Sequence, residues 1–286
     1  MIGFEYRAPE TLEEVCAALD EMGEDARLIA GGTALVLLMK QRLVHPAVLL
    51  SLKRIESLRT IAHEDGRLRI GATAAQRQIE NNPHVERHFP ALVETLRRVA
   101  TPRVRNQGTL GGNLAHADPN LDPPATLIAL DASVRLRSSR GERTVPVDEL
   151  FVDYYETVLQ PGEVLTDIVV PLPAGGSGCA FLKFLPRSSD DYATAAAAAC
   201  LRLGGGVCRD VRLALGSAGP TPIRARGAEA ILEGQAPTEE ALRAAAAAVR
   251  DVVDPLSDVR GSAEYKREMA EVFAYRALKG AIERAG

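Results

Sequence analysis

The sequence predicts an α+β protein of two domains, and three observations carry this prediction. The chain has 286 residues, of which 46% are hydrophobic, and roughly 100–200 residues per domain make two domains the natural expectation. Segments with apolar residues at helical spacing are interleaved with short apolar or alternating segments that are typical of strands. A stretch rich in Pro, Gly and Ser, PLPAGGSGC (171–179), precedes a shift to alanine-rich composition, and it is the best candidate for a domain boundary.

The first part of the chain contains two predicted helices and two predicted strands. In the first helix, TLEEVCAALDEMGE, apolar residues recur at helical spacing, and Thr11 followed by Glu14 has the pattern of a capping box. A short apolar run then leads into a pair of glycines, and an apolar helix and a second apolar strand follow. The expected elements are helix 11–24, strand 26–32, helix 34–43 and strand 47–55.

The middle of the chain continues this mixture of elements. RLRIGATA (67–74) alternates as a half-buried strand does, and HFPALVETLRRVA (88–100) is an amphipathic helix. DPPATLIALDA (122–132) is a helix that Pro123 and Pro124 open. The next stretch, 133–151, predicts a hairpin that turns around Ser139–Gly141 and then an acidic turn.

An alanine run, ATAAAAAC (193–200), is ambiguous between a helix and a strand. Propensity alone favours a helix. The Gly204–Gly206 turn and the alternating VCRDVRLALGS that follows favour a hairpin, which makes the alanine run a strand. We prefer the strand, because its small side chains let another layer pack closely. Three helices are expected after it, in 223–234, 238–253 and 262–285.

Charge and cysteine content narrow the classes of function. The net charge is −4, which gives no electrostatic reason to expect binding to nucleic acid or to an anionic membrane. The apolar runs fall short of the roughly 18 residues of a membrane span, so no membrane insertion is expected, and the acidic N-terminus does not resemble a signal peptide. No cysteine pair forms CxxC or has metal or iron–sulfur spacing, which predicts free thiols in a cytoplasmic protein. The cysteines are Cys16, Cys179, Cys200 and Cys208.

Other candidate metal ligands carry little weight. His84 and His88 are four residues apart, a spacing that would put both on one face of a helix, but no third ligand is near them in the sequence. We therefore read them as a surface pair and expect no metal site in this chain.

Two double glycines are the strongest sign of a ligand site. They stand in RLIAGGTALVLLMKQRL (27–43) and GTLGGNLAHADPNLDPP (108–124). Glycine permits positive φ and close approach of a ligand to the backbone, and successive N–H groups in such turns bind anions. Neither stretch is GxGxxG or GxxxxGK[ST], so both common nucleotide fingerprints are missing. A single double glycine is typical of a structural turn, whereas the presence of two favours a site in which two loops hold a pyrophosphate.

These stretches carry a resemblance to a known family. IAGGTALVLLMKQRL, RNQGTLGGNLAHADPNLDPPATLIALDA and GEVLTDIVVPLP, with the later FLKFLPRSSDDYATAAAA, resemble the FAD-binding medium subunit of the molybdenum hydroxylases. These enzymes are of the carbon monoxide dehydrogenase, xanthine dehydrogenase and nicotine dehydrogenase type. The resemblance implies a PCMH-type FAD-binding domain over 1–174, with subdomains of about 1–57 and 58–174. A CO dehydrogenase flavoprotein C-terminal domain over 178–286 follows, with a three-stranded antiparallel sheet and helices.

The resemblance also implies where FAD lies. The cofactor is expected to extend between the domains, with its pyrophosphate on the two glycine loops. Ala34 stands where the family often has Ser or Asp, which removes one possible hydrogen bond, and Arg103 stands where Gln is common. The loop positions that match the family are Leu28, Ile29, Ala30, Gly31, Gly32, Thr33 and Ala34 in the first loop, and Thr109, Gly111, Gly112 and Asn113 in the second.

Five further positions match the family's flavin site, and most have a plainer interpretation beside the functional one. Asp118 is a flavin contact or a turn residue. Asp122 lies near the ribityl–phosphate region or caps the helix that follows it. Leu165 matches an aliphatic residue beside the isoalloxazine. Lys183 lies near the polar edge of the flavin or is a solvated strand residue, and Tyr192 covers one flavin face or packs between domains.

The function that the resemblance implies is electron transfer. Substrate is hydroxylated at a molybdopterin centre in a large partner subunit, and electrons pass through two [2Fe–2S] clusters of a small partner subunit to FAD and on to an external acceptor. A dimer of such heterotrimers is the expected assembly, and no catalytic acid or base is expected in this chain. The alternatives are a self-contained flavin oxidoreductase and a nucleotide-binding regulatory module without redox turnover.

Overall fold

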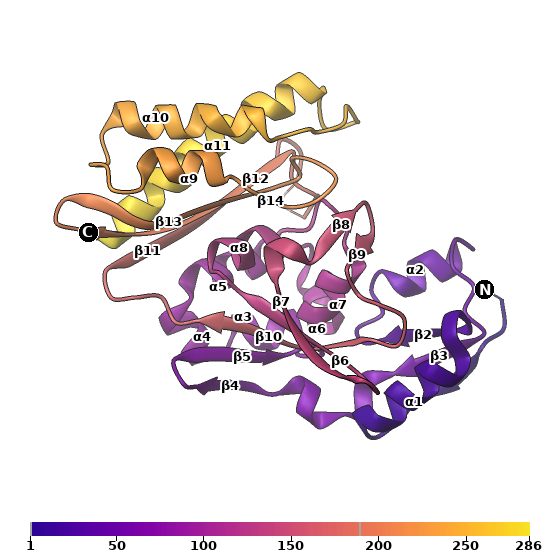
Figure 1. Cartoon of the computed structure of the whole chain (residues 1–286). Helices are drawn as coiled ribbons and strands as arrows, with labels where there is room; N and C mark the ends of the chain where they lie inside the picture. The colour runs from indigo at the N-terminus through magenta and orange to yellow at the C-terminus, as the bar shows by residue number, and fades with distance from the viewer. Residues whose placement is uncertain (1, 189) are drawn as a thin grey trace.

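Three sheets, each with its own helices, make up the fold (Figure 1). The computed structural model describes residues 2–188 and 190–286. Three strands form an N-terminal sheet, five form a central sheet and four form a C-terminal sheet. A small hairpin of β8 (Phe151–Asp153) and β9 (Glu156–Thr157) stands apart from them. The mixture of helices and sheets confirms the predicted α+β class.

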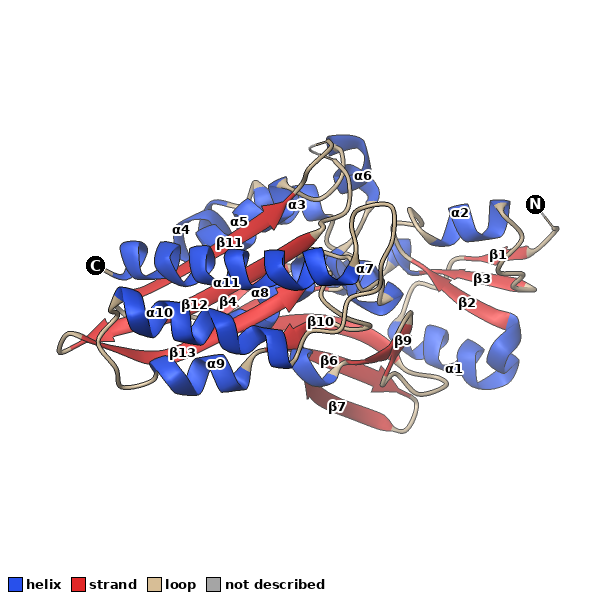
Figure 2. Ribbon diagram, turned by 90° about the horizontal axis from the view of Figure 1, so that it is seen from above, coloured by secondary structure: helices blue, strands red, loops and turns tan. Residues whose placement is uncertain are grey.

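The N-terminal sheet is parallel, in the order β1-β3-β2, and lies at one end of the molecule (Figure 2). Apolar residues of α1 form one core with residues of β2 and β3. The Thr11 hydroxyl accepts from the N–H of Glu14, as the capping box predicts, but the Glu14 carboxylate accepts from Glu10, so the box is half formed. The elements are β1 (Glu5–Arg7), α1 (Leu12–Met22), β2 (Ala26–Ile29), α2 (Leu35–Lys40) and β3 (Val48–Ser51).

The central sheet is antiparallel, in the order β4-β5-β10-β6-β7. It contains the predicted strand in 67–74 and the predicted hairpin, and the helices in 88–100 and 122–132 are confirmed. The strands are β4 (Ile61–Glu64), β5 (Arg67–Gly71), β6 (Ser133–Ser138), β7 (Gly141–Pro146) and β10 (Val164–Pro171). The helices are α3 (Gln76–Glu80), α4 (Pro83–His88), α5 (Pro90–Arg97), α6 (Pro102–Gln107), α7 (Leu110–His116) and α8 (Pro123–Ala129).

Four of these helices went unpredicted. Helices α3, α4, α6 and α7 have only five to seven residues each. An amphipathic pattern needs a window of about 11–18 residues to be visible, so helices this short leave no periodicity to detect. Side-chain caps from Asn82, Thr101 and Thr109 mark the starts of three of them.

The C-terminal sheet has four strands, in the order β11-β12-β13-β14, where three were expected. The extra strand is β14 (Ile223–Arg224), which pairs with Ala214 and Leu215. The sequence pattern assigned these two residues to the following helix, which instead begins at Arg226. The remaining elements are β11 (Ser177–Phe184), β12 (Ala195–Gly204), β13 (Val207–Gly216), α9 (Arg226–Leu232), α10 (Glu239–Ala247) and α11 (Ala263–Ala285).

The alanine run is a strand, as we preferred, and its position explains its composition. Helix α11 packs on one face of β12, and α8 from the N-terminal part of the chain packs on the other (Figure 1). Ala197 and Ala199 belong to the core on the α11 side, whereas Ala196 and Ala198 belong to the core on the α8 side. Small side chains on both faces let the two helical layers approach the sheet closely.

The prediction of four free thiols is wrong for two of them. Cys179 on β11 and Cys200 on β12 lie directly opposite each other, with 4.2 Å between their Cα atoms, and form a disulfide. Cys16 and Cys208 are free and buried. Only the strand register brings Cys179 and Cys200 together, because 21 residues separate them in sequence.

None of the helices within 2–188 and 190–286 is long and apolar enough to cross a membrane.

Candidate functional site

The two predicted glycine loops lie side by side, although about eighty residues separate them in sequence. A Cβ atom at Gly31 would lie 2.0 Å from the carbonyl oxygen of Gln107, so the two backbones are in direct contact. A Cβ atom at Gly108 would lie 3.5 Å from the hydroxyl oxygen of Thr33. The fold therefore brings the loops together, as a pyrophosphate held by both requires.

The two glycines of each pair do different things. Gly31 touches Gln107, and a Cβ at Gly111 would lie 2.5 Å from the Cβ of Ala72, so the first glycine of each pair serves close packing inside the protein. Gly32 has φ +71°, a left-handed conformation that favours glycine. Gly112 is exposed. The second glycine of each pair therefore makes no close contact with the backbone of another segment, and a Cβ atom there would meet only side-chain atoms.

The first loop offers backbone donors. Among the described residues, the N–H groups of Gly31, Gly32, Thr33 and Ala34 donate to no protein acceptor. Successive free N–H groups of this kind bind anions. Ala34 has no side-chain hydroxyl or carboxylate to offer a ligand, but its backbone N–H group is still available as a donor.

The second loop offers side-chain groups instead. The Thr109 hydroxyl accepts from the N–H of Gly112 at 3.1 Å and so caps α7, while its own proton stays available to a ligand. The Oδ1 atom of Asn113 is buried without a partner in the described chain. A buried polar atom without a partner costs free energy unless a ligand or water satisfies it.

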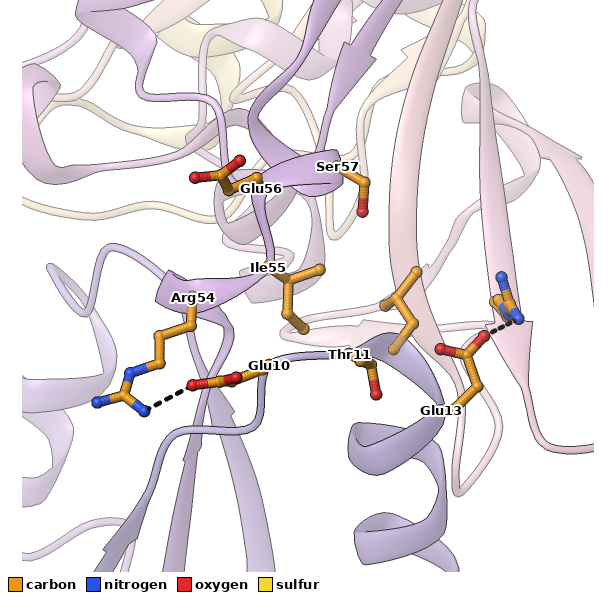
Figure 3. A pocket seen from close by; sticks show the side chains of 9 residues that line it. Glu10, Thr11, Glu13, Arg54, Ile55, Glu56 and Ser57 are labelled. Atoms are coloured by element: carbon orange, nitrogen blue, oxygen red, sulfur yellow. Dashed lines mark hydrogen bonds and ion pairs between the residues drawn. The ribbon is translucent and has the colours of Figure 1, made fainter.

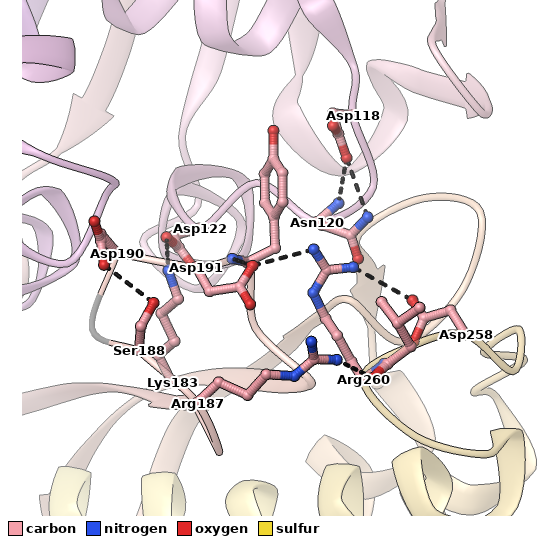
Figure 4. Close-up of polar contacts among 12 residues, drawn as sticks. Asp118, Asn120, Asp122, Lys183, Arg187, Ser188, Asp190, Asp191, Asp258 and Arg260 are labelled. Atoms are coloured by element: carbon pink, nitrogen blue, oxygen red, sulfur yellow. Dashed lines mark hydrogen bonds and ion pairs between the residues drawn. The ribbon is translucent and has the colours of Figure 1, made fainter.

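A buried ion pair joins Asp122, which directly precedes α8, to Lys183 on the C-terminal sheet (Figure 4). The Nζ atom of Lys183 on β11 lies 2.8 Å from Oδ2 of Asp122 and donates to the carbonyl oxygen of Arg98 at 3.1 Å. The Lys183 and Asp122 side chains are 1% and 5% exposed. Lys183 is therefore not a solvated strand residue. Asp122 stands at the N-cap position of α8, but its side chain makes no capping hydrogen bond. The Oδ1 atom of Asp122 has no partner among the described residues.

The titration of Asp122 predicts a pH dependence of stability. Burial raises the pKa of Asp122 to about 6, while Lys183 and Arg98 oppose the shift. A raised pKa in the folded chain contributes stability below the unfolded pKa, and that contribution is lost as pH rises through about 6. Relative to Asp122→Asn, the unfolding free energy of the wild type should fall by about 3 kcal/mol between pH 3.5 and pH 7. Urea unfolding of both proteins across this range measures the difference, and parallel pH curves would contradict it.

Asp118 lies close enough to Tyr192 to affect the titration of the tyrosine hydroxyl; Figure 4 labels Asp118 beside Asn120. The Oδ1 atom of Asp118 accepts from the backbone N–H of Asn120 at 2.9 Å, which is the turn role considered from the sequence. Its Oδ2 atom accepts from the Tyr155 hydroxyl at 3.4 Å. Burial and the nearby Asp118 carboxylate raise the pKa of Tyr192 to about 12. The Arg260 guanidinium, which also belongs to the C-terminal part of the chain, lies 5.4 Å from the centre of the Tyr192 ring.

Leu165 lies deeper than the other predicted positions. It is on β10, is 6% exposed and belongs to the central core. Helix α7, which follows Thr109, contacts β10. Leu165 shares this core with Leu110 and Leu114 of α7.

Three polar residues at this site were missed from the sequence. Thr194 Oγ1, Ser217 Oγ and Gln76 Oε1 are buried without partners among residues 2–188 and 190–286. The N–H of Ser217 donates to the carbonyl oxygen of Pro119, three residues before Asp122. The N–H of Thr194 donates to the carbonyl oxygen of Phe184, which directly follows Lys183. No sequence signal could have found them, because only burial distinguishes them from other hydroxyls and amides.

These features fit FAD. Free N–H groups meet the needs of a pyrophosphate, and unpartnered hydroxyl, amide and carboxylate oxygens meet the needs of ribityl and flavin polar groups. We use the name seam for the two glycine loops, the residues that carry these unpartnered atoms, and Lys183 and Tyr192.

A separate hollow of about 480 Å³ lies between α1 and the turn over 54–57 (Figure 3). Its charged groups already pair with one another, Arg54 with Glu10 and Arg137 with Glu13. None of the unpartnered buried polar atoms of the described residues belongs to its lining. We interpret this hollow as part of the interface between the N-terminal and central sheets and not as a cofactor site.

Comparisons with known proteins agree with the geometry. The family of the FAD binding domain in molybdopterin dehydrogenase matches residues 2–173, and that of the CO dehydrogenase flavoprotein C-terminal domain matches 180–281. The chain is 41% identical to the carbon monoxide dehydrogenase medium chain of Hydrogenophaga pseudoflava over 98% of each chain. It is 35% identical to subunit alpha of the 6-hydroxypseudooxynicotine dehydrogenase complex of Paenarthrobacter nicotinovorans, over 99% of this chain and 95% of that one.

A solved structure shows the same fold. A chain of the H. pseudoflava carbon monoxide dehydrogenase, in a form that lacks the Mo-pyranopterin moiety of its molybdenum cofactor, superposes with a TM-score of 0.97 at 42% identity. Coverage is 100% of both chains. The chain therefore belongs to the family of FAD-binding medium subunits of the molybdenum hydroxylases.

Proposed function

We propose that this chain is the electron-transfer subunit of a heterotrimeric molybdenum hydroxylase, passing electrons from iron–sulfur clusters of a partner to an external acceptor. The observation that carries the proposal is the contact between the two glycine loops, with free backbone donors on the first, together with the unpartnered buried polar atoms of the seam. Membership of the family supports FAD as the cofactor of this seam.

The residues of the seam divide the work of binding. The first loop, 28–34, and the second, 109–113, would hold the pyrophosphate, while Asp122, Lys183 and Tyr192 would orient the flavin end. FAD, when bound, supplies the reversible uptake and release of electrons. The chain's own residues bind the cofactor, exclude water from its buried part and fix its orientation. No side chain needs to act as a general acid or base for this role.

Two further subunits complete the proposal, a small one that holds [2Fe–2S] clusters and a large one that holds molybdopterin. Relatives that match over 98% of their length are called medium chains, which supports partners of this kind. The cysteines of this chain also support a division of labour, because Cys179 and Cys200 bond to each other and Cys16 and Cys208 are buried apart. A dimer of heterotrimers in the cytoplasm is the assembly we propose.

Reconstitution tests this function. The purified chain should take up FAD in preference to FMN or NAD. With FAD alone it should show no substrate-dependent reduction of a dye, and adding the iron–sulfur and molybdopterin subunits should restore that reduction. The matched control is the same mixture with Gly32→Val in this chain, which should assemble without dye reduction. Robust turnover of an organic substrate by this chain with FAD alone would instead favour a self-contained flavoenzyme.

A chain that ignores FAD but binds ATP or NAD tightly would favour the regulatory module.

A further inference from the structure

A second buried ion pair lies next to the glycine loops, and the cofactor proposal does not use it. Nε of Arg105 on α6 donates to Oε2 of Glu80 on α3 at 3.0 Å. Their side chains are 7% and 0% exposed. Arg77 also contacts the Glu80 carboxylate from the protein surface. Taking two charges out of water costs free energy that the attraction between them only partly returns, so such a pair contributes little net stability.

The Arg105 guanidinium is anchored on its other side as well. Its Nη1 atom donates to the carbonyl oxygens of Val99 at 2.9 Å and Ala100 at 3.2 Å. Ala100 has φ +40°, which is uncommon for a residue with a side chain. The carbonyl of Arg98 accepts from Lys183 in the same turn. One planar guanidinium thus fixes α3, α6 and the 98–100 turn relative to one another.

Each of the two helices that the pair joins has one terminus at the contact between the glycine loops: α3 begins there and α6 ends there. The N–H of Gln76, the first residue of α3, donates to the carbonyl oxygen of Gly108 at 2.9 Å. Gln107 ends α6, and its carbonyl oxygen is the atom that lies against Gly31. The N–H of Gly108 in turn donates to Val104 on α6 at 2.7 Å. A shift of α6 relative to α3 would therefore move one glycine loop against the other.

We propose that Arg105, together with Glu80, is a positioning residue for the cofactor: the pair sets the spacing of the two glycine loops that receive the pyrophosphate. The proposal rests on the function proposed above. Arg105 touches no cofactor itself and acts through Gln107, Gly108 and Gly31. The planar fork of arginine suits one carboxylate and two carbonyls at once, which the compact ammonium of lysine cannot match.

Binding of ADP to the full chain tests the role, because ADP carries the pyrophosphate without the flavin. Arg105→Lys keeps the charge but loses the fork, and it should weaken ADP and FAD binding by about tenfold in calorimetric titrations. The matched control is Arg224→Lys, which alters the ion pair of Arg224 with Glu229 between β14 and α9 at 2.9 Å. The control should lower the melting temperature by a similar amount and leave ADP binding unchanged.

The double variant Glu80→Gln/Arg105→Gln keeps the test decisive if Arg105→Lys folds poorly, because it leaves no unpaired charge in the core. It should fold and bind ADP about tenfold more weakly than the wild type. Wild-type ADP affinity in a folded Arg105 variant, or equal weakening by Arg224→Lys, would overturn the positioning role. A wild-type chain that binds neither ADP nor FAD would instead overturn the proposed function.

Discussion

Gly31→Val is expected to give a chain that is less stable by about 3 kcal/mol or more and that no longer binds FAD. The first atom that any side chain adds at this position would lie 2.0 Å from the carbonyl oxygen of Gln107 and 2.8 Å from its carbonyl carbon. Backbone atoms cannot turn aside as a flexible side chain can, so the two loops must separate. Because both loops are proposed to hold the pyrophosphate, separation removes the cofactor site along with the packing.

The neighbouring glycine is the matched control. At Gly32 a Cβ would meet only side-chain atoms, Ile29 Cδ1 at 3.1 Å and Val36 Cγ2 at 3.3 Å, and the main cost is its positive φ. Gly32→Val should therefore cost about 1–2 kcal/mol and stay folded while FAD binding is lost. Thermal unfolding and FAD titration of both variants separate packing from binding. Equal melting temperatures for Gly31→Val and the wild type would contradict the tight loop contact.

Lys183→Met is expected to lower the unfolding free energy by about 3–5 kcal/mol at pH 7, because it leaves the buried Asp122 carboxylate without its cation. The loss should be smaller at pH 5, since Asp122, whose pKa is about 6, becomes neutral there. Denaturant unfolding at both pH values measures the effect.

The control for this prediction is Asp122→Asn/Lys183→Met, which removes both charges. It should recover most of the stability at pH 7, because an apolar and a neutral side chain can replace a buried ion pair at little cost. A single variant as stable as the wild type at pH 7 would mean that water reaches Asp122 and that the seam is open without a cofactor.

Much of the fold follows from local signals in the sequence. The alternation in 67–74, the two prolines that open α8 and the glycine turn after the alanine run each predicted an element that forms. Failures fall where local signals are weakest. Helices of five to seven residues have no periodicity, and the strand Ile223–Arg224 exists only because β13 lies beside it.

The candidate site likewise has some features that the sequence predicts and others that only the structure reveals. Two double glycines are visible in the sequence and predict a pyrophosphate site, and the structure places them against each other. The pairing of Asp122 with Lys183 was not predicted, although each residue was singled out, because nothing local links positions 61 residues apart. Thr194 and Ser217 belong to no recognisable sequence motif. Their hydroxyls become candidate ligand contacts only because the fold buries them without a hydrogen-bond partner among the described residues.

By itself, the sequence determined the class of fold, the strand nature of the alanine run, the two glycine loops and the family, because each depends on residue type and short spacing. Tertiary structure alone decided which glycine of each pair packs against another backbone, which cysteines meet, and how Glu80 pairs with Arg105 and Asp122 with Lys183. The physical reason is that burial and contacts between distant segments determine three energies: the cost of a buried charge, the pairing of two thiols and the strain that a Cβ atom would cause at a glycine. Those quantities come into existence only when the chain is folded.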